Sequence, residues 1–155
     1  MMKNSLLVEI TRIVENSAEK HDFLLKTAQT IQNKYPQYNW VGFYFLNNGK
    51  LHVGPFVGKP TPHSIIELNS GICGAAVSQN ETIVIDDVNA DPRYLACSLE
   101  TKSEIVIPIK CNGEIIGELD IDSAKKAAFT DDDKRILEEA AELIGDILSK
   151  YKSGG

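Results

Sequence analysis

Hydrophobic side chains recur at helical spacing towards both ends of the chain. Near the N-terminus they are three and four residues apart in two stretches, 6–14 and 23–31. This period is typical of amphipathic helices, so we expect one or two helices that end before Pro36. A longer helix is predicted from Thr130, which would cap it, to about Tyr151. Three aspartates in its first turn complement the helix dipole.

Alternating apolar runs and turn residues predict two β-hairpins. Asn47-Asn48-Gly49 separates two apolar runs within residues 39–56, and Asn112-Gly113 joins the runs 104–110 and 114–123. Asn-Gly is favoured in tight type I′ turns, which connect antiparallel strands.

Shorter elements are expected between the two hairpins. The pattern indicates a strand at 65–68, a helix at 71–79 with Ser70 as its N-cap, and a strand at 81–88. Residues 89–103 read as a loop or an irregular helix, punctuated by Asp91-Pro92.

This order of elements predicts an α+β fold with three layers. The terminal helices would cover one face of a central antiparallel sheet, and the irregular middle segment would lie over a pocket on the other face. No repeat or linker interrupts residues 1–155, so we expect a single domain.

Composition and charge narrow the classes of function. The chain carries 22 acidic and 16 basic residues and a net charge of −6, which argues against nucleic-acid binding through a basic face. No apolar run approaches the length of a membrane span, and charged residues interrupt the N-terminal segment, so we expect a cytoplasmic protein without membrane contact. Thiols are normally kept reduced there, so a disulfide would be transient or catalytic.

Acidic and aromatic side chains share faces of the predicted strands. Strand alternation places Asp120 and Asp122 on one face with Glu118, and Trp40 and Tyr44 together on one face of an earlier strand. Taken alone, the acids fit a solvated face best and the aromatics fit a core. Facing each other, they would suit a ligand with a cationic head and an apolar or thioether body.

Three cysteines, Cys73, Cys97 and Cys111, form neither a disulfide framework nor a zinc motif, so we expect no metal site. Cys73 lies at the predicted start of a helix, where the dipole would lower its pKa. Cys97 ends a loop 24 positions later and could meet Cys73 across the pocket. We interpret Cys111 as structural or incidental, and His63 as a lone exposed or hydrogen-bonded histidine.

Several stretches of the chain together resemble the GAF-domain family of free methionine-(R)-sulfoxide reductases: NWVGFYFL, GPFVGKP, GICGAAV, IDDVNADPRYLACSLETKSEIVIPI and NGEIIGELDIDS. The resemblance runs from about Asn39 to the final helix. The last two stretches alone would indicate only a GAF domain. The aromatic pair, both cysteine motifs and the acids together are more specific to the reductases.

The resemblance implies a function and a set of site residues. The substrate would be free methionine sulfoxide, with Trp40 and Tyr44 lining its methyl-sulfoxide end. The carboxyl groups of Glu104, Asp120 and Asp122 would bind its polar groups and assist protonation of the oxygen. Cys97 would attack the sulfoxide, and the resulting sulfenic acid would become a disulfide that a thioredoxin-like reductant restores. No cofactor is expected.

Two positions depart from the family pattern. Pro62 stands where a further cysteine is usual, so Cys73 would have to act as the second thiol, and Ser98 replaces an aspartate after Cys97. The order in which the two thiols attack stays open. Two alternatives use the same pocket and thiols: a non-catalytic GAF module that senses a small molecule, and a thiol redox sensor without a substrate.

The terminal helices also suggest a homodimer. The last helix has more apolar positions than one covering face needs, and Leu6, Leu7 and Ile10 could join them in a bundle with a second copy. The alternative is that the terminal helices cover each other within one chain, and the sequence supports it nearly as well.

Overall fold

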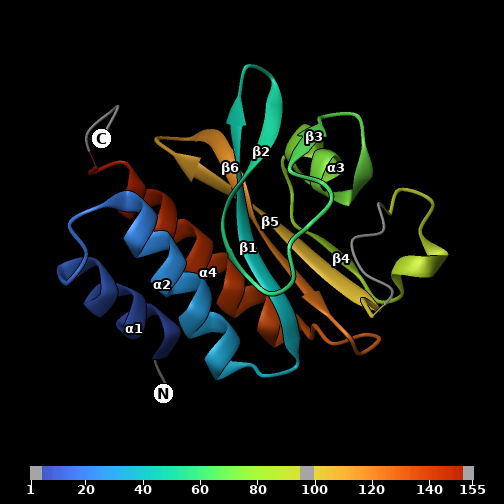
Figure 1. Ribbon diagram of the computed structural model, residues 1–155, viewed down its shortest axis with the longest axis horizontal. Coiled ribbons are helices and arrows are strands. Elements are labelled where there is room, and N and C mark those ends of the chain that lie inside the picture. Colours follow the sequence, from blue (N-terminus) through green and yellow to red (C-terminus); the bar gives the residue numbers. More distant parts are fainter. Residues whose placement is uncertain (1–4, 95–99, 152–155) are drawn as a thin grey trace.

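The computed structural model describes residues 5–94 and 100–151, and at its centre is a six-stranded antiparallel sheet (Figure 1). The strand order is β3-β2-β1-β6-β5-β4. The strands are β1 (Tyr38–Asn47), β2 (Lys50–Val57), β3 (Ile65–Glu67), β4 (Ile83–Ile85), β5 (Ser103–Cys111) and β6 (Glu114–Ser123). The long central strands come from the two hairpins that the sequence predicted.

Both hairpins turn through two residues with left-handed backbone conformations. Asn48 and Gly49 have φ angles of 54° and 76°, and Asn112 and Gly113 have φ angles of 53° and 83°. Two successive positive φ angles are the requirement of a type I′ turn, which asparagine and glycine meet at low steric cost. The type I′ turn predicted at Asn112-Gly113 is therefore confirmed, and Asn48-Gly49 adopts the same pair of positive φ angles.

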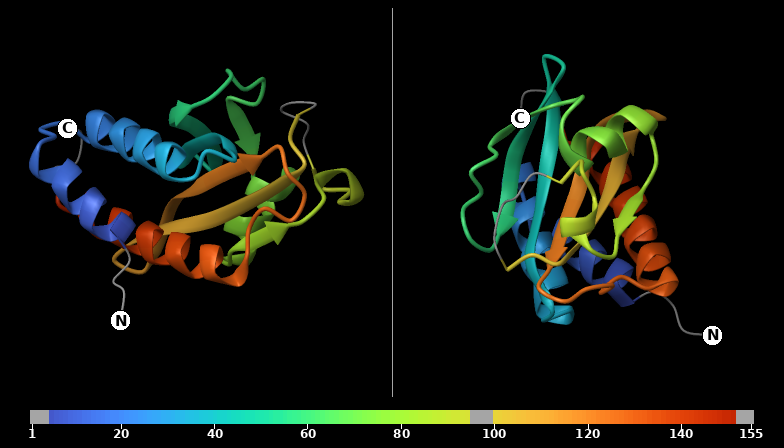
Figure 2. Two further views of the ribbon diagram at one scale, coloured as in Figure 1. Left: turned by 90° about the horizontal axis from the view of Figure 1, so that it is seen from below. Right: turned by 90° about the vertical axis from the view of Figure 1, so that its right-hand side faces the viewer.

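Three helices cover one face of the sheet (Figure 2). They are α1 (Ser5–Glu15), α2 (Lys20–Lys34) and α4 (Asp131–Leu148). Their buried side chains form one hydrophobic core with alternate residues of the central strands, among them Val41, Ile105 and Ile121. The predicted α+β architecture, with the terminal helices on one face, is confirmed.

The start of α4 is fixed by a capping box. The Thr130 hydroxyl accepts a hydrogen bond from the Asp133 amide at 3.1 Å, and the Asp133 carboxylate accepts one from the Thr130 amide at 2.9 Å. Each side chain thereby satisfies a backbone donor that the first turn of a helix leaves unpaired. The predicted cap at Thr130 is confirmed.

A short helix and the connecting loops lie over the other face. Helix α3 (Gly71–Gln79) packs with Trp40 and Tyr44 in a second, smaller hydrophobic cluster. Ser70 occupies its N-cap position, but its side chain makes no cap hydrogen bond, so only the position was predicted correctly. The strand expected at 81–88 is limited to β4, because its remainder enters a turn of 3-10 helix at Val88–Ala90.

The first helix is largely occupied within its own chain. Leu6 and Ile10 are fully buried in the main core, where α1 contacts α2 and α4, so they are not available to a second copy. The prediction that these two residues face a partner is wrong, and Val8, 44% exposed, is the large apolar side chain that α1 presents to solvent.

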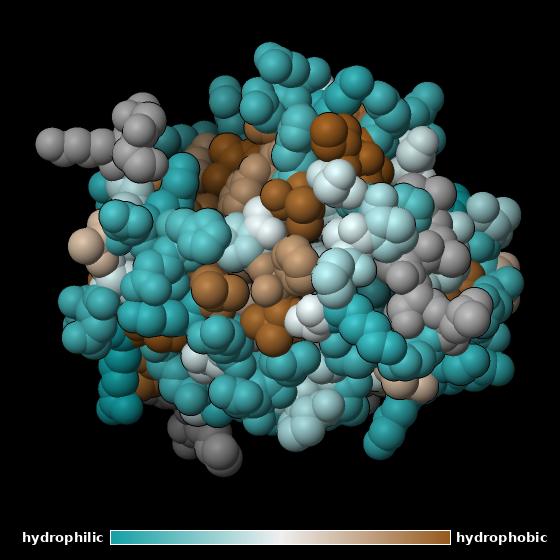
Figure 3. Space-filling model, in the orientation of Figure 1, coloured by the Kyte–Doolittle hydropathy of each residue, from teal (hydrophilic) through white to brown (hydrophobic). Residues whose placement is uncertain are grey.

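Figure 3 shows a mostly hydrophilic surface broken by small apolar patches. Within the described ranges, no helix combines the length and apolar character that a membrane crossing requires.

Candidate active site

Three neighbouring strands align the acidic side chains of the candidate site. Trp40 of β1 pairs with Asp122 of β6, which pairs in turn with Glu104 of β5. In the next row on the same face, Gly42 pairs with Asp120. Side chains alternate across a strand, so all of these positions look away from α1, α2 and α4.

A glycine makes room for the Trp40 indole. A β-carbon at Gly42 would lie only 2.5 Å from Cη2 of Trp40, so the ring lies directly over this backbone position. The indole also stacks on Phe56, with ring centroids 5.3 Å apart, and its Nε1 donates a hydrogen bond to the Lys59 carbonyl at 3.0 Å. These contacts hold the indole in one orientation.

The second aromatic ring lies beside the first. The centroids of Trp40 and Tyr44 are 6.2 Å apart, and the Tyr44 hydroxyl donates a hydrogen bond to the His63 carbonyl at 2.9 Å. Both rings belong to the cluster under α3 and not to the helix-covered core. The predicted common face of the two aromatics is confirmed.

Four carboxyl groups are buried on this face. Glu118 is fully buried, and Glu104, Asp120 and Asp122 are at most 6% exposed. The interpretation of this strand as a solvated face is wrong, because α3 and the loops close over it. Both oxygens of Glu118 and one oxygen each of Asp120 and Asp122 have no hydrogen-bond partner within the part of the chain that the structure describes.

Burial makes Glu118, Asp120 and Asp122 weaker acids than exposed carboxyl groups. It raises the pKa of Glu118 and of Asp122 well above their usual values, and the negative charge of Asp120 raises both further. The pKa of Asp120 is also raised, chiefly by burial. A low-dielectric site disfavours the charged forms. The site therefore retains protons at a pH where exposed carboxyl groups have lost them.

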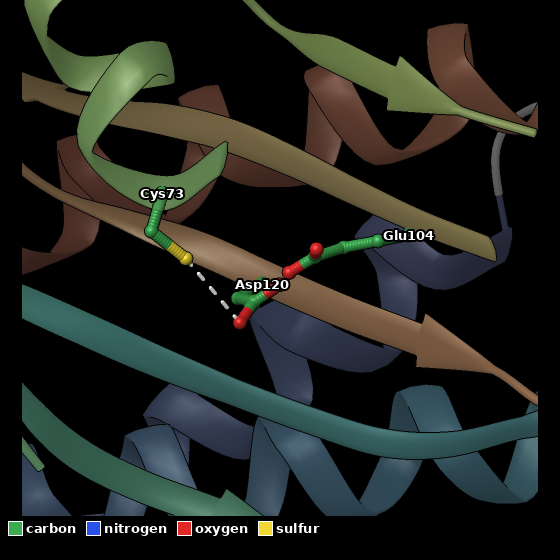
Figure 4. Close-up of side chains that lie close together, drawn as sticks. All are labelled: Cys73, Glu104 and Asp120. Carbon is green, nitrogen blue, oxygen red and sulfur yellow. Dashed lines mark hydrogen bonds between the residues drawn. The ribbon is translucent and has the colours of Figure 1, made fainter. Parts of the chain in front are cut away.

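Cys73 points from the first turn of α3 towards these acids (Figure 4). Its Sγ lies 3.5 Å from Oδ2 of Asp120. Burial raises the pKa of the Cys73 thiol well above its ordinary value, and the charges of Asp120, Glu118 and Glu104 raise it further. The expectation that the helix N-terminus lowers this pKa is therefore wrong, and Cys73 rests as a neutral thiol.

Two small cavities divide the predicted site residues between them. Tyr44, Glu104 and Asp120 line a cavity of about 20 Å³ together with Cys73. Trp40 and Asp122 line one of about 60 Å³, at which the exposed ion pair between Lys59 and Glu100 also lies. The larger hollow of about 720 Å³ between α4 and β5 contains none of the predicted site residues.

The remaining candidates fall into three groups. Cys97 lies outside the described residues, and so does the predicted approach of Cys73 to Cys97. Cys111 lies away from the site, with its thiol 3.2 Å from the Gly145 carbonyl oxygen. His63, interpreted as a lone histidine, lines the smaller cavity. The sequence pattern places Glu118 on the acidic face of its strand but assigns it no role. Strand parity was the signal that could have selected Glu118.

Comparisons with known proteins agree with this geometry. The family model described as "GAF domain" matches residues 19–148. Protein YtsP of Bacillus subtilis (strain 168) is 35% identical over 147 residues, which cover 94% of this chain and 90% of that protein.

Two further relatives are named for an activity. The free methionine-R-sulfoxide reductase of Escherichia coli (strain K12) is 36% identical over 126 residues, covering 81% of this chain and 76% of that protein. The structure of a type II free methionine-R-sulfoxide reductase from Thermoplasma acidophilum superposes with a TM-score of 0.82 at 41% identity, covering 90% of this chain and 96% of that one.

Proposed function

Since this chain belongs to the GAF-domain family of free methionine-R-sulfoxide reductases, we propose that it reduces free L-methionine-(R)-sulfoxide to methionine. The observation that carries the proposal is the convergence of a thiol, buried carboxyl groups and two aromatic rings on one face of the sheet. A thiol can accept oxygen from a sulfoxide, a carboxylic acid can protonate that oxygen, and aromatic rings suit the methyl end of the substrate.

The proposed reaction uses two thiols as the source of two electrons. The Cys97 thiolate attacks the sulfoxide sulfur and forms a sulfur–sulfur bond, while a buried carboxylic acid protonates the oxygen. The protonated oxygen then transfers to the Cys97 sulfur as its bond to the substrate sulfur and the new sulfur–sulfur bond both break. Methionine leaves with the electron pair, and Cys97 becomes a sulfenic acid. The Cys73 thiol then displaces water from the sulfenic acid and forms a disulfide.

The resting state of Cys73 supports this order. Only a thiolate is an effective nucleophile, and burial beside carboxyl groups raises the pKa of Cys73 well above its usual value. A thiol of this kind is poorly suited to the first attack. It can still react second, when the electrophile is a sulfenic acid held nearby.

The carboxyl groups have two tasks in this proposal. One of Glu104, Asp120 and Asp122 supplies the proton, and burial raises the pKa of Asp120 and of Asp122. The others bind the substrate ammonium group, which would give these buried acids a cationic partner. Trp40 and Tyr44 would enclose the methyl-sulfoxide end.

Three further features belong to the same proposal. A thioredoxin-like reductant would restore both thiols by exchange with the disulfide. Such a cycle suits the cytoplasm, where disulfides do not persist.

We also keep the homodimer as a proposal, now without Leu6 and Ile10 in its interface. Light scattering at micromolar concentration tests it, and a monomer mass would refute it.

Thioredoxin-coupled turnover tests the function. Purified chain, thioredoxin, its reductase and NADPH are mixed with free methionine-(R)-sulfoxide, and NADPH consumption and methionine formation are measured. We expect turnover of the R epimer and none of the S epimer. Binding of the sulfoxide without turnover would refute the reductase and favour a ligand-sensing GAF module.

Single-turnover measurements separate the two thiols. Without a reductant, the Cys73→Ser variant is expected to form one methionine per chain and then stop, whereas Cys97→Ser is expected to form none. Cys111→Ser is the matched control and should turn over like the unaltered chain. A Cys97→Ser variant that still forms methionine would reverse the assigned roles.

A further inference from the structure

Beyond the reductase reaction, we infer that Cys73, Glu104 and Asp120 form a binding site for one zinc-type divalent cation. The site would hold the metal through the Cys73 sulfur and one oxygen from each carboxylate. It has no counterpart in sequence motifs for zinc, because its three residues come from α3, β5 and β6 and only the fold brings them together.

The donor atoms already have a compact arrangement. One donor atom from each of the three residues lies within 4.8 Å of the other two, and all three residues are buried. Zinc binds sulfur at about 2.3 Å and carboxylate oxygen at about 2.0–2.2 Å, so tetrahedral donors lie roughly 3–4 Å apart. The side chains therefore need to close by about an ångström, which a rotation of side-chain torsions supplies. Figure 4 shows the Cys73 sulfur and the Glu104 carboxyl group approaching Asp120 from its two sides.

The charge around the site favours a cation. Glu118, which is fully buried, has no hydrogen-bond partner for either carboxyl oxygen among the described residues, and Oδ1 of Asp120 also has none. No ion pair joins Glu118 or Asp120 to a basic side chain within the same ranges. Glu118 is close enough for its charge to act on the Cys73 thiol. Buried carboxylates without a positive partner are costly, and a divalent ion would supply that partner.

The mixture of donors selects the class of metal. A thiolate with two carboxylates suits zinc and its thiophilic analogues cadmium and cobalt, whereas magnesium and calcium prefer oxygen ligands alone. Binding would displace the thiol proton to solvent and leave a cysteine sulfur bonded to the metal. The adjoining cavity of about 20 Å³ has room for one water as a fourth ligand.

Occupancy of this site would block the proposed reductase. A metal-bound Cys73 sulfur cannot resolve a sulfenic acid, and the bound carboxylates cannot accept the substrate ammonium group. Zinc would therefore inhibit turnover in competition with methionine sulfoxide, a consequence that rests on the proposed function. Metal binding itself does not rest on it.

Metal titration of the full chain tests the inference without any turnover. The Cys97→Ser variant serves as the background, because it leaves only Cys73 and Cys111 as thiols. Reduced and metal-free protein is titrated with Zn²⁺ by calorimetry and with Co²⁺ by absorbance, where a sulfur-to-metal charge-transfer band reports thiolate ligation. We expect one ion per chain and the band, and no binding of Mg²⁺.

Matched second substitutions locate the ion. Cys73→Ser should abolish the charge-transfer band and weaken Zn²⁺ binding at least tenfold, whereas Cys111→Ser should change neither. Asp120→Asn should weaken binding at least tenfold and retain the band, which keeps the test sharp even if the serine variant fails to fold. No binding to the background variant, or a band that survives Cys73→Ser, would overturn the site. Zinc binding without any reductase activity would leave the site standing and remove the proposed function alone.

Discussion

Replacing Gly42 by alanine is expected to move the Trp40 indole without altering a group that reacts. The added β-carbon would lie 2.5 Å from Cη2 of Trp40 and 2.6 Å from Cβ of Phe56. Carbon atoms in ordinary contact are about 3.5–4.0 Å apart, so the ring or the neighbouring strand has to shift by about 1 Å. A one-methyl change thereby becomes a displacement of one wall of the site.

The surroundings prevent the indole from sliding away freely. Its Nε1 hydrogen bond to the Lys59 carbonyl and its stacking on Phe56 fix one side, and its Cδ1 faces the backbone of Gly58 closely. Overpacking of this kind costs about 1–3 kcal/mol of stability. If about 1.4 kcal/mol of substrate binding is lost with the ring position, KM for methionine sulfoxide rises by about tenfold.

Steady-state kinetics and urea unfolding of the Gly42→Ala variant measure the two effects separately. Gly54→Ala is the control. Its added β-carbon would lie 3.0 Å from Phe45, which packs against the main core, and Trp40 is not among its three nearest atoms. The control should lose some stability with KM unchanged. An unchanged KM in a folded Gly42→Ala variant would show that the position of Trp40 does not matter for the substrate.

Two further substitutions have distinct expected outcomes. Burial, and then the charge of Asp120, raise the pKa of Glu118. Between the usual glutamate pKa and this raised pKa, the folded chain therefore binds more protons than the unfolded chain. The free energy of unfolding falls as pH rises through this range. In urea titrations from pH 5 to about pH 8, Glu118→Gln should flatten this fall. The difference is about 1.4 kcal/mol for each pH unit over which Glu118 is protonated in the folded chain and ionised in the unfolded chain. Parallel curves of unfolding free energy against pH for the variant and the unaltered chain would contradict the raised pKa. Thr130→Ala should lower the free energy of unfolding by about 0.5–2 kcal/mol with KM unchanged, because the capping box with Asp133 lies on the helix-covered side, whereas Thr130→Ser should retain most of the stability.

The fold could be predicted wherever local chemistry decides it. Asn48-Gly49 and Asn112-Gly113 specify type I′ turns by their tolerance of positive φ, and Thr130 with Asp133 specifies the start of α4. The common face of Trp40 and Tyr44 follows from the two-residue period of a strand, which any regular strand obeys.

Features that depend on contacts distant in sequence could not be predicted in this way. The acids at Asp120 and Asp122 look solvated when their strand is considered alone, because alternation gives the face and not what covers it. Helix α3 closes that face from about fifty positions earlier in the chain. In the same way, Leu6 and Ile10 looked available to a partner because the packing of α1 on α2 and α4 leaves no local signal.

Two opposing effects act on the pKa of Cys73, and their relative sizes decide its direction. A helix N-terminus stabilises a nearby negative charge by about 0.3–1 kcal/mol at an exposed position. Removing that charge from water opposes it with an effective penalty of several kcal/mol, even after the protein relaxes. The three carboxyl groups beside Cys73 add to the penalty, so burial outweighs the dipole and the thiol stays protonated. A metal ion bonded to the Cys73 sulfur would reverse this balance, because it compensates the carboxylates and displaces the thiol proton. The reactivity of Cys73 is therefore expected to depend on what occupies the pocket.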